Sequence, residues 1–168
     1  AGGQAAAPTR GPSHLTLLIP ARNESQALEA TVRALEGGVT VPHEILIVDD
    51  HSTDGTADVA RRLAAEFPRI RVVPNGGPPG FGRAVRAGLA AVHDGWVVPV
   101  MADFCDDPAT INAMAAAAAG GADVVVGCRN MAGGGREGGP AFKGLGSRAV
   151  SWMLHELGGL PTRDATIA

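Results

Sequence analysis

Two stretches of sequence decide the fold class: residues 15–25 read LTLLIPARNES, and residues 44–56 read EILIVDDHSTDGT. Each begins with a run of leucine, isoleucine and valine that has the length of one buried β-strand, and each ends in polar residues. The segment between them carries apolar residues near helical spacing and stops at Gly37-Gly38. The pattern therefore predicts a strand, a helix and a strand in succession, the unit of a parallel sheet covered by helices.

The same alternation continues along the chain. We expect strands at Leu15–Ile19, Glu44–Val48, Ile70–Val73, Trp96–Met101 and Ala122–Gly127. We expect helices at Glu24–Leu35, from Thr53 or Asp54 to about Glu66, at Phe81–His93, at Pro108–Ala119 and at about Phe142–Leu157. Residues 1–13 are small and rich in Gly and Pro, which predicts a flexible N-terminal arm, and residues 14–168 are expected to form one α/β domain with a mostly parallel sheet.

Composition excludes several classes of protein. Apolar residues make up 45% of the 168 residues, too many for a disordered chain. The net charge of −3 does not suit a general nucleic-acid binder, so no nucleic-acid partner is expected. The longest apolar runs fall short of the roughly 18 residues that a membrane-spanning helix needs. Cys105 and Cys128 form neither a metal-ligand pair nor a disulfide framework, which favours a cytoplasmic location.

Polar residues follow the predicted strands, and in open parallel sheets the ligand lies beyond the carboxyl ends of the strands. Asp49-Asp50 follows the second strand and could accept hydrogen bonds from a base or a ribose, or could form an Asx turn before a helix. Three carboxylates follow the fourth strand. Oxygen ligands of this kind suit Mg²⁺ or Mn²⁺, and we expect Asp103 to hold the ion while Asp106 and Asp107 cap the next helix.

Two further segments suit phosphate groups. Gly80 and Gly82 stand where a loop meets a helix, so that backbone N–H groups could approach a phosphate. A dinucleotide-binding G-x-G-x-x-G motif is absent because Val85 stands at its third glycine position. Four cations surround a glycine-rich loop, where they could close over phosphates or form a solvated basic face: Arg129, Arg136, Lys143 and Arg148.

Five segments occur together along the chain: LLIPARNES, ILIVDDHSTDGT, GFGRAVRAG, VMADFCDDP and VVVGCRN. In this order and spacing they resemble the family-2 glycosyltransferases, most closely the branch of the dolichol- and polyprenol-phosphate mannosyltransferases. The resemblance covers about Leu15 to Ala168 and implies a GT-A-like three-layer sandwich that binds a nucleotide-diphosphate sugar. It implies that a GDP-mannose or UDP-glucose type of donor gives its sugar to a polyprenyl or dolichyl phosphate, with inversion at the anomeric carbon.

The resemblance and the strand-end positions assign roles to individual residues. Donor binding is expected from Pro20, Ala21, Arg22, Asn23, Glu24, Asp49, Asp50, Ser52, Gly80, Gly82, Ala102 and Asp103. Catalysis is expected from Asp103, Arg129 and Asp164. The acceptor phosphate is expected to contact Arg129, Arg136, Lys143, Ser147 and Arg148, and the metal ligand is Asp103.

The chain departs from the family pattern at three positions. Arg22 replaces the tyrosine of the P-x-Y-N-E motif. Met101 replaces the first aspartate of the D-x-D motif, and Cys105 replaces a glutamine that follows it. Methionine is a poor ligand for a hard cation, so binding of Mg²⁺ or Mn²⁺ would depend on Asp103, the donor phosphates and water, with Asp106 or Asp107 as a possible addition.

Two alternatives remain beside transfer to a lipid phosphate. One is a family-2 transferase with a hydroxyl acceptor, in which Asp164 would act as the base. The other is a nucleotide-sugar-binding module without catalytic activity. Family members continue beyond the segment that resembles PTRDATIA, so the domain is expected to lack its C-terminal end. A lipid-phosphate acceptor would require peripheral contact at the cytoplasmic face of a membrane.

Overall fold

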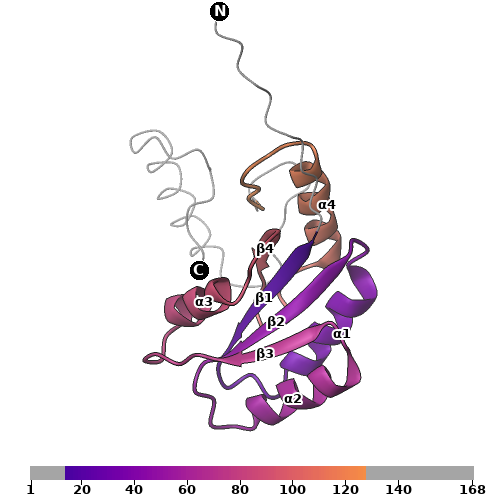
Figure 1. The fold of residues 1–168 in the computed structure, drawn as a ribbon. Helices are drawn as coiled ribbons and strands as arrows, with labels where there is room; N and C mark the ends of the chain where they lie inside the picture. Colours follow the sequence, from indigo (N-terminus) through magenta and orange to yellow (C-terminus); the bar gives the residue numbers. More distant parts are fainter. Residues whose placement is uncertain (1–13, 128–168) are drawn as a thin grey trace, which may run out of the picture. The chain divides into compact units, whose positions relative to one another are not determined.

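Parallel strands form the sheet in this protein, whose computed structural model describes residues 14–127. They are β1 (Leu15–Ala21), β2 (His43–Asp49), β3 (Ile70–Pro74) and β4 (Trp96–Pro99). Their order is β3-β2-β1-β4, so the longest strands, β1 and β2, lie at the centre (Figure 1). Leu17 pairs with Ile45 of β2 and with Val98 of β4, and Ile45 pairs with Ile70 of β3.

Helices follow each strand and cover both faces of the sheet (Figure 1). They are α1 (Leu28–Gly38), α2 (Thr56–Glu66), α3 (Phe81–Ala90) and α4 (Pro108–Ala119). The chain divides into two units, residues 1–123 and 124–168. All of these strands and helices belong to the first unit.

The alternation of side chains along the strands builds two apolar layers. Leu17 of β1 packs with Ile45 of β2 and with buried residues of α1, α2 and α4. Leu18, the next residue, faces the other side and packs with Val48 of β2 and Ala84 of α3. Successive strand residues point to opposite faces, so a strand buried on both faces is apolar at every position. The expected three-layer α/β sandwich with a parallel sheet is confirmed.

Several element bounds differ from the predictions for tertiary reasons. Helix α1 begins at Leu28 and not at Glu24, because the backbone of residues 23–25 is bonded to the loop after β2. Strand β4 ends at Pro99, which has no N–H group for the ladder. The fifth strand predicted at Ala122–Gly127 is wrong, since these residues form no strand. The predicted arm at residues 1–13 and the helix at Phe142–Leu157 lie outside the described residues.

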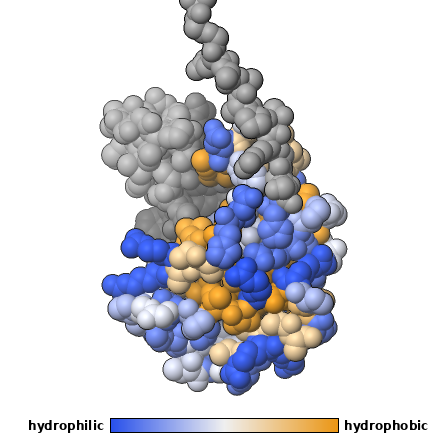
Figure 2. All heavy atoms as spheres, in the orientation of Figure 1, coloured by the Kyte–Doolittle hydropathy of each residue, from blue (hydrophilic) through white to orange (hydrophobic). Residues whose placement is uncertain are grey.

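The outer surface is mostly hydrophilic on the face shown in Figure 2, with apolar residues gathered over the region where the sheet lies in Figure 1. An ionic network joins α1 to α2 on the outside of one layer: Arg33 bonds Glu29 and Glu66, and Arg62 bonds Glu29. Within residues 14–127, no helix has both the length and the apolar character required to span a membrane.

Replacing Gly88 by alanine is expected to destabilise the fold by about 1–3 kcal/mol, because the core at this position has no room. A Cβ atom on Gly88 would lie 2.2 Å from Leu18 Cδ1 and 3.0 Å from Val48 Cγ2. Leu18 is fully buried and cannot move aside. Urea unfolding monitored by circular dichroism measures the change.

The matched control is Gly37→Ala in α1, where an added Cβ meets nothing within 4 Å. Alanine is the better helix former by about 1 kcal/mol, so this variant should unfold at the same or a higher urea concentration. An equal gain in stability for the Gly88 and Gly37 variants would contradict the close packing of α3 on the sheet.

Candidate functional site

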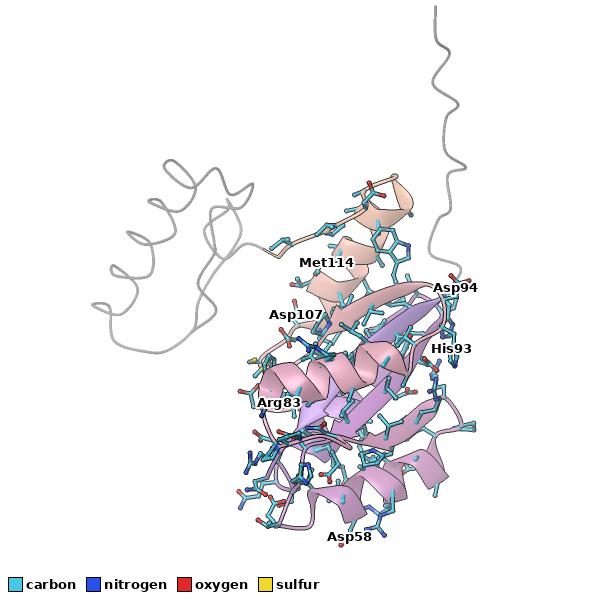
Figure 3. The ribbon with its side chains drawn as sticks, turned by 60° about the vertical axis from the view of Figure 1, so that its left-hand side comes forward. Asp58, Arg83, His93, Asp94, Asp107 and Met114 are labelled. Atoms are coloured by element: carbon cyan, nitrogen blue, oxygen red, sulfur yellow. The ribbon has the colours of Figure 1, made fainter. Side chains whose placement is uncertain are left out.

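A pocket opens at the carboxyl edge of the sheet. Its wall comes from the end of β1, from the loops after β1, β2 and β4 and from the start of α3: Pro20, Ala21, Arg22, Glu24, Asp50, Gly80, Phe81, Ala84, Met101 and Ala102. Figure 3 labels Arg83 in the first turn of α3, whose start lines the pocket, and Asp107 directly before α4, the helix that follows the loop after β4. The position agrees with the rule that ligands of parallel sheets lie beyond the carboxyl ends of the strands.

Asp50 is the buried carboxylate of the pocket, with 3% of its surface exposed. Its Oδ1 accepts a hydrogen bond from Asn75 Nδ2 at 2.6 Å, and its Oδ2 accepts one from the Gly80 N–H group at 2.8 Å. Burial alone would raise the pKa of Asp50, but these two hydrogen bonds and the nearby charge of Arg22 lower the pKa below its ordinary value of 3.8. The carboxylate is therefore ionised at neutral pH and can accept further hydrogen bonds from a ligand.

Asn75 is a structural partner of this carboxylate that the sequence patterns did not reveal. It follows β3, is 5% exposed and donates from its backbone N–H to the Asp49 carbonyl. Its side chain also donates to the Pro78 carbonyl and accepts from the Gly77 N–H group. Asn75 thus fixes the turn after β3 and holds Asp50 in position.

The loop after β1 is fixed to the loop after β2 by side-chain bonds. Asn23 adopts a positive φ of 58°, its N–H donates to Ser52 Oγ, and its Oδ1 accepts from the Thr53 N–H group. The Glu24 N–H group donates to Thr56 Oγ1. Asn23 and Ser52 therefore position the backbone beside the pocket and do not line it.

Asp54 completes this junction. Its Oδ2 accepts from the Ser25 N–H group, and its Oδ1 accepts from both the N–H and the hydroxyl of Thr56 in the first turn of α2. The hydrogen bond from the Thr56 hydroxyl is the largest cause that lowers the pKa of Asp54. The helix-capping contact expected near Thr53 or Asp54 is therefore made by the Asp54 side chain, while Gly55 occupies the N-cap position.

The loop after β4 has an unusual backbone. Phe104 adopts a φ of 64°, a conformation that is strained for a bulky side chain, and its ring is 56% exposed. The carbonyl of Ala102 accepts a buried hydrogen bond from Thr31 of α1, which anchors the start of the loop. Each non-glycine residue with positive φ among residues 14–127 lies in a loop after β1, β2 or β4: Asn23, His51 and Phe104.

The three carboxylates of this loop have separate surroundings. Asp107 is the N-cap of α4 and accepts from the Ala109 N–H group, as expected. Asp106 does not cap the helix. Its Oδ2 accepts from the Met101 N–H group at 2.7 Å, because β4 has already ended and that N–H needs a partner. Asp103 is exposed on the loop.

Burial, a hydrogen bond to Asp103 and the negative charge of Asp106 raise the pKa of the Cys105 thiol to about 12. We therefore expect Cys105 to react with iodoacetamide near pH 8 at least about tenfold more slowly than glutathione, because the thiolate is the reactive form. Peptide-resolved mass spectrometry over time measures the rate. Asp103→Asn should speed the reaction. Equal rates for Cys105 and glutathione would contradict the prediction.

The structure brings seven of the twelve expected donor-binding residues to the pocket wall: Pro20, Ala21, Arg22, Glu24, Asp50, Gly80 and Ala102. The other five do not line it: Asn23, Asp49, Ser52, Gly82 and Asp103. Three lining residues carried no expectation of donor contact: Phe81, Ala84 and Met101. The remaining expected site residues lie outside the described residues: Arg129, Arg136, Lys143, Ser147, Arg148 and Asp164.

The described residues offer a divalent ion few side-chain ligands. Within residues 14–127, no group of three or more histidine, cysteine, aspartate or glutamate side chains could hold a metal. Met101 offers a soft thioether, the raised pKa keeps the Cys105 thiol protonated, and Asp106 is bonded to the backbone. Asp103 is the carboxylate of this loop that remains for a hard cation.

The family is decided by comparison with known proteins. The model of glycosyl transferase family 2 matches residues 16–149, most of the chain. The chain belongs to glycosyl transferase family 2. This family-2 domain therefore has the GT-A type of fold, and the pocket at its sheet edge lies within the matched segment.

Curated relatives extend the comparison. An uncharacterized glycosyltransferase of Mycobacterium tuberculosis is 33% identical over 150 residues, which cover 89% of this chain and 63% of that protein. An undecaprenyl-phosphate mannosyltransferase of Micrococcus luteus is 32% identical over 152 residues, which cover 89% of this chain and 62% of that protein. The family-2 domain thus spans somewhat less than two thirds of the length of these relatives.

A solved structure supports the fold. A mannosyltransferase of Pyrobaculum calidifontis, in complex with GDP-Man and Mn²⁺, aligns with a TM-score of 0.51 and 29% identity. The alignment covers 57% of this chain and 29% of that chain.

Proposed function

We propose that this domain transfers a sugar from a nucleotide-diphosphate sugar, of the GDP-mannose or UDP-glucose type, to a polyprenyl or dolichyl phosphate with inversion. The observation that carries the proposal is the pocket at the carboxyl edge, which brings Arg22, Glu24 and the buried Asp50 together in a family-2 chain. Support also comes from the relative named as an undecaprenyl-phosphate mannosyltransferase and from the mannosyltransferase solved with GDP-Man.

Donor binding follows from the charges and donors of the pocket. The ionised Asp50 carboxylate accepts hydrogen bonds from N–H or O–H groups of the nucleoside. The start of α3 lines the same pocket with its N-cap Gly80 and with Phe81, and the N-terminus of a helix favours negative charge such as a diphosphate. Asp50 accepts a hydrogen bond from the Gly80 N–H group, so the nucleoside and the diphosphate of a donor would lie beside each other at the start of α3.

The transfer step needs little proton movement. An oxygen of the acceptor phosphate attacks the anomeric carbon from the face opposite the nucleoside diphosphate, and a new C–O bond forms. The C–O bond to the donor diphosphate breaks at the same carbon, and its electron pair leaves with the nucleoside diphosphate. The acceptor phosphate is anionic at neutral pH, so its orientation matters more than removal of a proton. We propose that the acceptor phosphate is oriented by Arg129, Arg136, Lys143, Ser147 and Arg148.

Asp103 is the proposed catalytic carboxylate of the described residues, with Arg129 and Asp164 as its proposed partners. When Mg²⁺ or Mn²⁺ is bound, it supplies positive charge for the departing diphosphate, and Asp103 is the described side chain that would hold it. With a lipid acceptor the reaction would take place at a membrane surface, and we propose peripheral contact at the cytoplasmic face.

One transfer assay tests the function. The full chain is incubated with GDP-mannose or UDP-glucose and with undecaprenyl phosphate in detergent, with a soluble sugar as the alternative acceptor. We expect a glycosyl phosphate lipid, with the anomeric configuration opposite to that of the donor when the product is measured by NMR. Transfer only to the soluble sugar would favour a hydroxyl acceptor. Donor binding without transfer to any acceptor would favour a non-catalytic binding module. The observation that favours this alternative is the apolar Met101 in the pocket.

A further inference from the structure

Two departures from the family pattern meet in one pocket. Arg22, where the motif has tyrosine, and Met101, where the motif has aspartate, both line it. The first replacement adds a positive charge and the second removes a negative charge, so both make the pocket more favourable to an anion. They come from the loops after β1 and β4, which are far apart in the sequence and adjacent in the sheet.

Arg22 is the one cation among the residues that line the pocket. Its guanidinium forms no hydrogen bond or ion pair with another residue in the described part of the chain, although it is close enough to Asp50 to lower the pKa of that carboxyl. A planar guanidinium can donate two parallel hydrogen bonds to a phosphate. The Arg22 guanidinium therefore has donors in the pocket that no residue within 14–127 occupies.

Several groups that could attract a metal ion at this place are replaced or already accept hydrogen bonds. Met101 lines the pocket with an apolar thioether side chain, as Phe81 does with its ring, and both residues are exposed. Asp106 is held by the Met101 N–H group. Both oxygens of Asp50 already accept hydrogen bonds, from Asn75 and Gly80.

We propose that Arg22 takes over the charge of a divalent ion in binding the donor diphosphate, so that donor affinity depends on Arg22 and not on Mg²⁺ or Mn²⁺. This inference rests on the proposed function and concerns donor binding alone. Met101 is the second residue that determines this metal independence, because its apolar side chain does not hold a divalent ion beside the diphosphate.

Calorimetric titration of the full chain with GDP-mannose and UDP-glucose, in EDTA and in Mn²⁺, tests this inference. The wild-type affinity for its donor should differ by less than about threefold between the two conditions, under 1 kcal/mol. Arg22→Ala should weaken binding in EDTA by at least about tenfold, and Arg22→Lys should restore part of it, since lysine keeps the charge without the fork.

Met101→Asp supplies the positive test, because position 101 is 39% exposed and tolerates a charge. Its donor affinity should become at least about tenfold higher in Mn²⁺ than in EDTA. Met101→Leu keeps an apolar side chain and should remain insensitive to Mn²⁺.

The outcomes separate this inference from the function. Wild-type binding that needs Mn²⁺ and disappears in EDTA would overturn the role of Arg22 and leave the proposed function standing. An Arg22→Ala variant that binds as tightly as the wild type in EDTA would do the same. No donor binding by the wild type in either condition would overturn both.

Discussion

Replacing Asp50 by asparagine is expected to abolish measurable donor binding and to lower the free energy of unfolding by about 1–3 kcal/mol. Asn75 and the Gly80 N–H group donate to the two carboxylate oxygens, at 2.6 and 2.8 Å. An asparagine has one oxygen and one NH₂ group, so one of these buried donors would face another donor. The variant also removes the negative charge of the carboxylate that we propose binds the nucleoside of the donor.

The pH dependence of stability gives this prediction a definite sign. The pKa of Asp50 is lower in the folded protein than its ordinary value of 3.8, so the wild type binds this proton less readily when folded. The stabilisation from Asp50 is therefore complete above the ordinary value and is lost as the pH falls through the folded value. The variant lacks this term, so its difference in stability from the wild type should shrink below about pH 4.

Urea unfolding and donor titration measure the two effects of this variant. The matched control is Asp58→Asn on α2, a residue labelled in Figure 3. Its carboxylate pairs with Arg61 at the exposed surface. Exposed pairs contribute at most about 1 kcal/mol, so the control should bind donor normally. Donor binding by Asp50→Asn at wild-type strength would contradict the role of the carboxylate, whatever the change in stability.

The layers of the fold could be predicted from sequence because the central strands are apolar at successive positions. Leu17 and Leu18 face opposite sides of the sheet and both are fully buried, which the uninterrupted apolar run around them anticipated. The bounds of α1 could not be predicted, since they depend on hydrogen bonds between segments about 30 residues apart, such as that from the Glu24 N–H group to Thr56. The run Val124–Val126 has the composition of a strand, yet composition alone does not supply a hydrogen-bonded neighbour.

The candidate site was accessible to sequence reasoning where residues follow strands directly. Asp50 and Glu24 were identified by their place after β2 and β1. Asn75 was missed because an asparagine before two glycines is typical of a turn, and its bond to Asp50 joins residues 25 positions apart. The one available signal was its position after β3. The placement of Phe81 and Met101 in one pocket also depends on the tertiary fold.

Asp103→Asn is expected to lower the turnover number by at least about a hundredfold, equivalent to about 2.7 kcal/mol of transition-state stabilisation. The departing nucleoside diphosphate gains negative charge during transfer, and Asp103 is proposed to hold the divalent ion that would offset this charge. Asp103 is the exposed carboxylate after β4 that is bonded neither to the backbone of Met101 nor to the cap of α4. Asparagine keeps the size of the side chain and removes its charge, so the change tests charge in particular.

A merely structural role for Asp103 would affect other measurements. Because this side chain is exposed, the free energy of unfolding should change by less than about 0.5 kcal/mol. Donor affinity should stay within about threefold of the wild type if Arg22 binds the diphosphate, so the loss should fall on turnover and not on binding. The Cys105 thiol should become more reactive in the same variant, because the carboxylate that accepts its hydrogen bond is gone. Unchanged transfer with a more reactive thiol would show that the charge was removed without consequence, and Asp103 would then have no catalytic role.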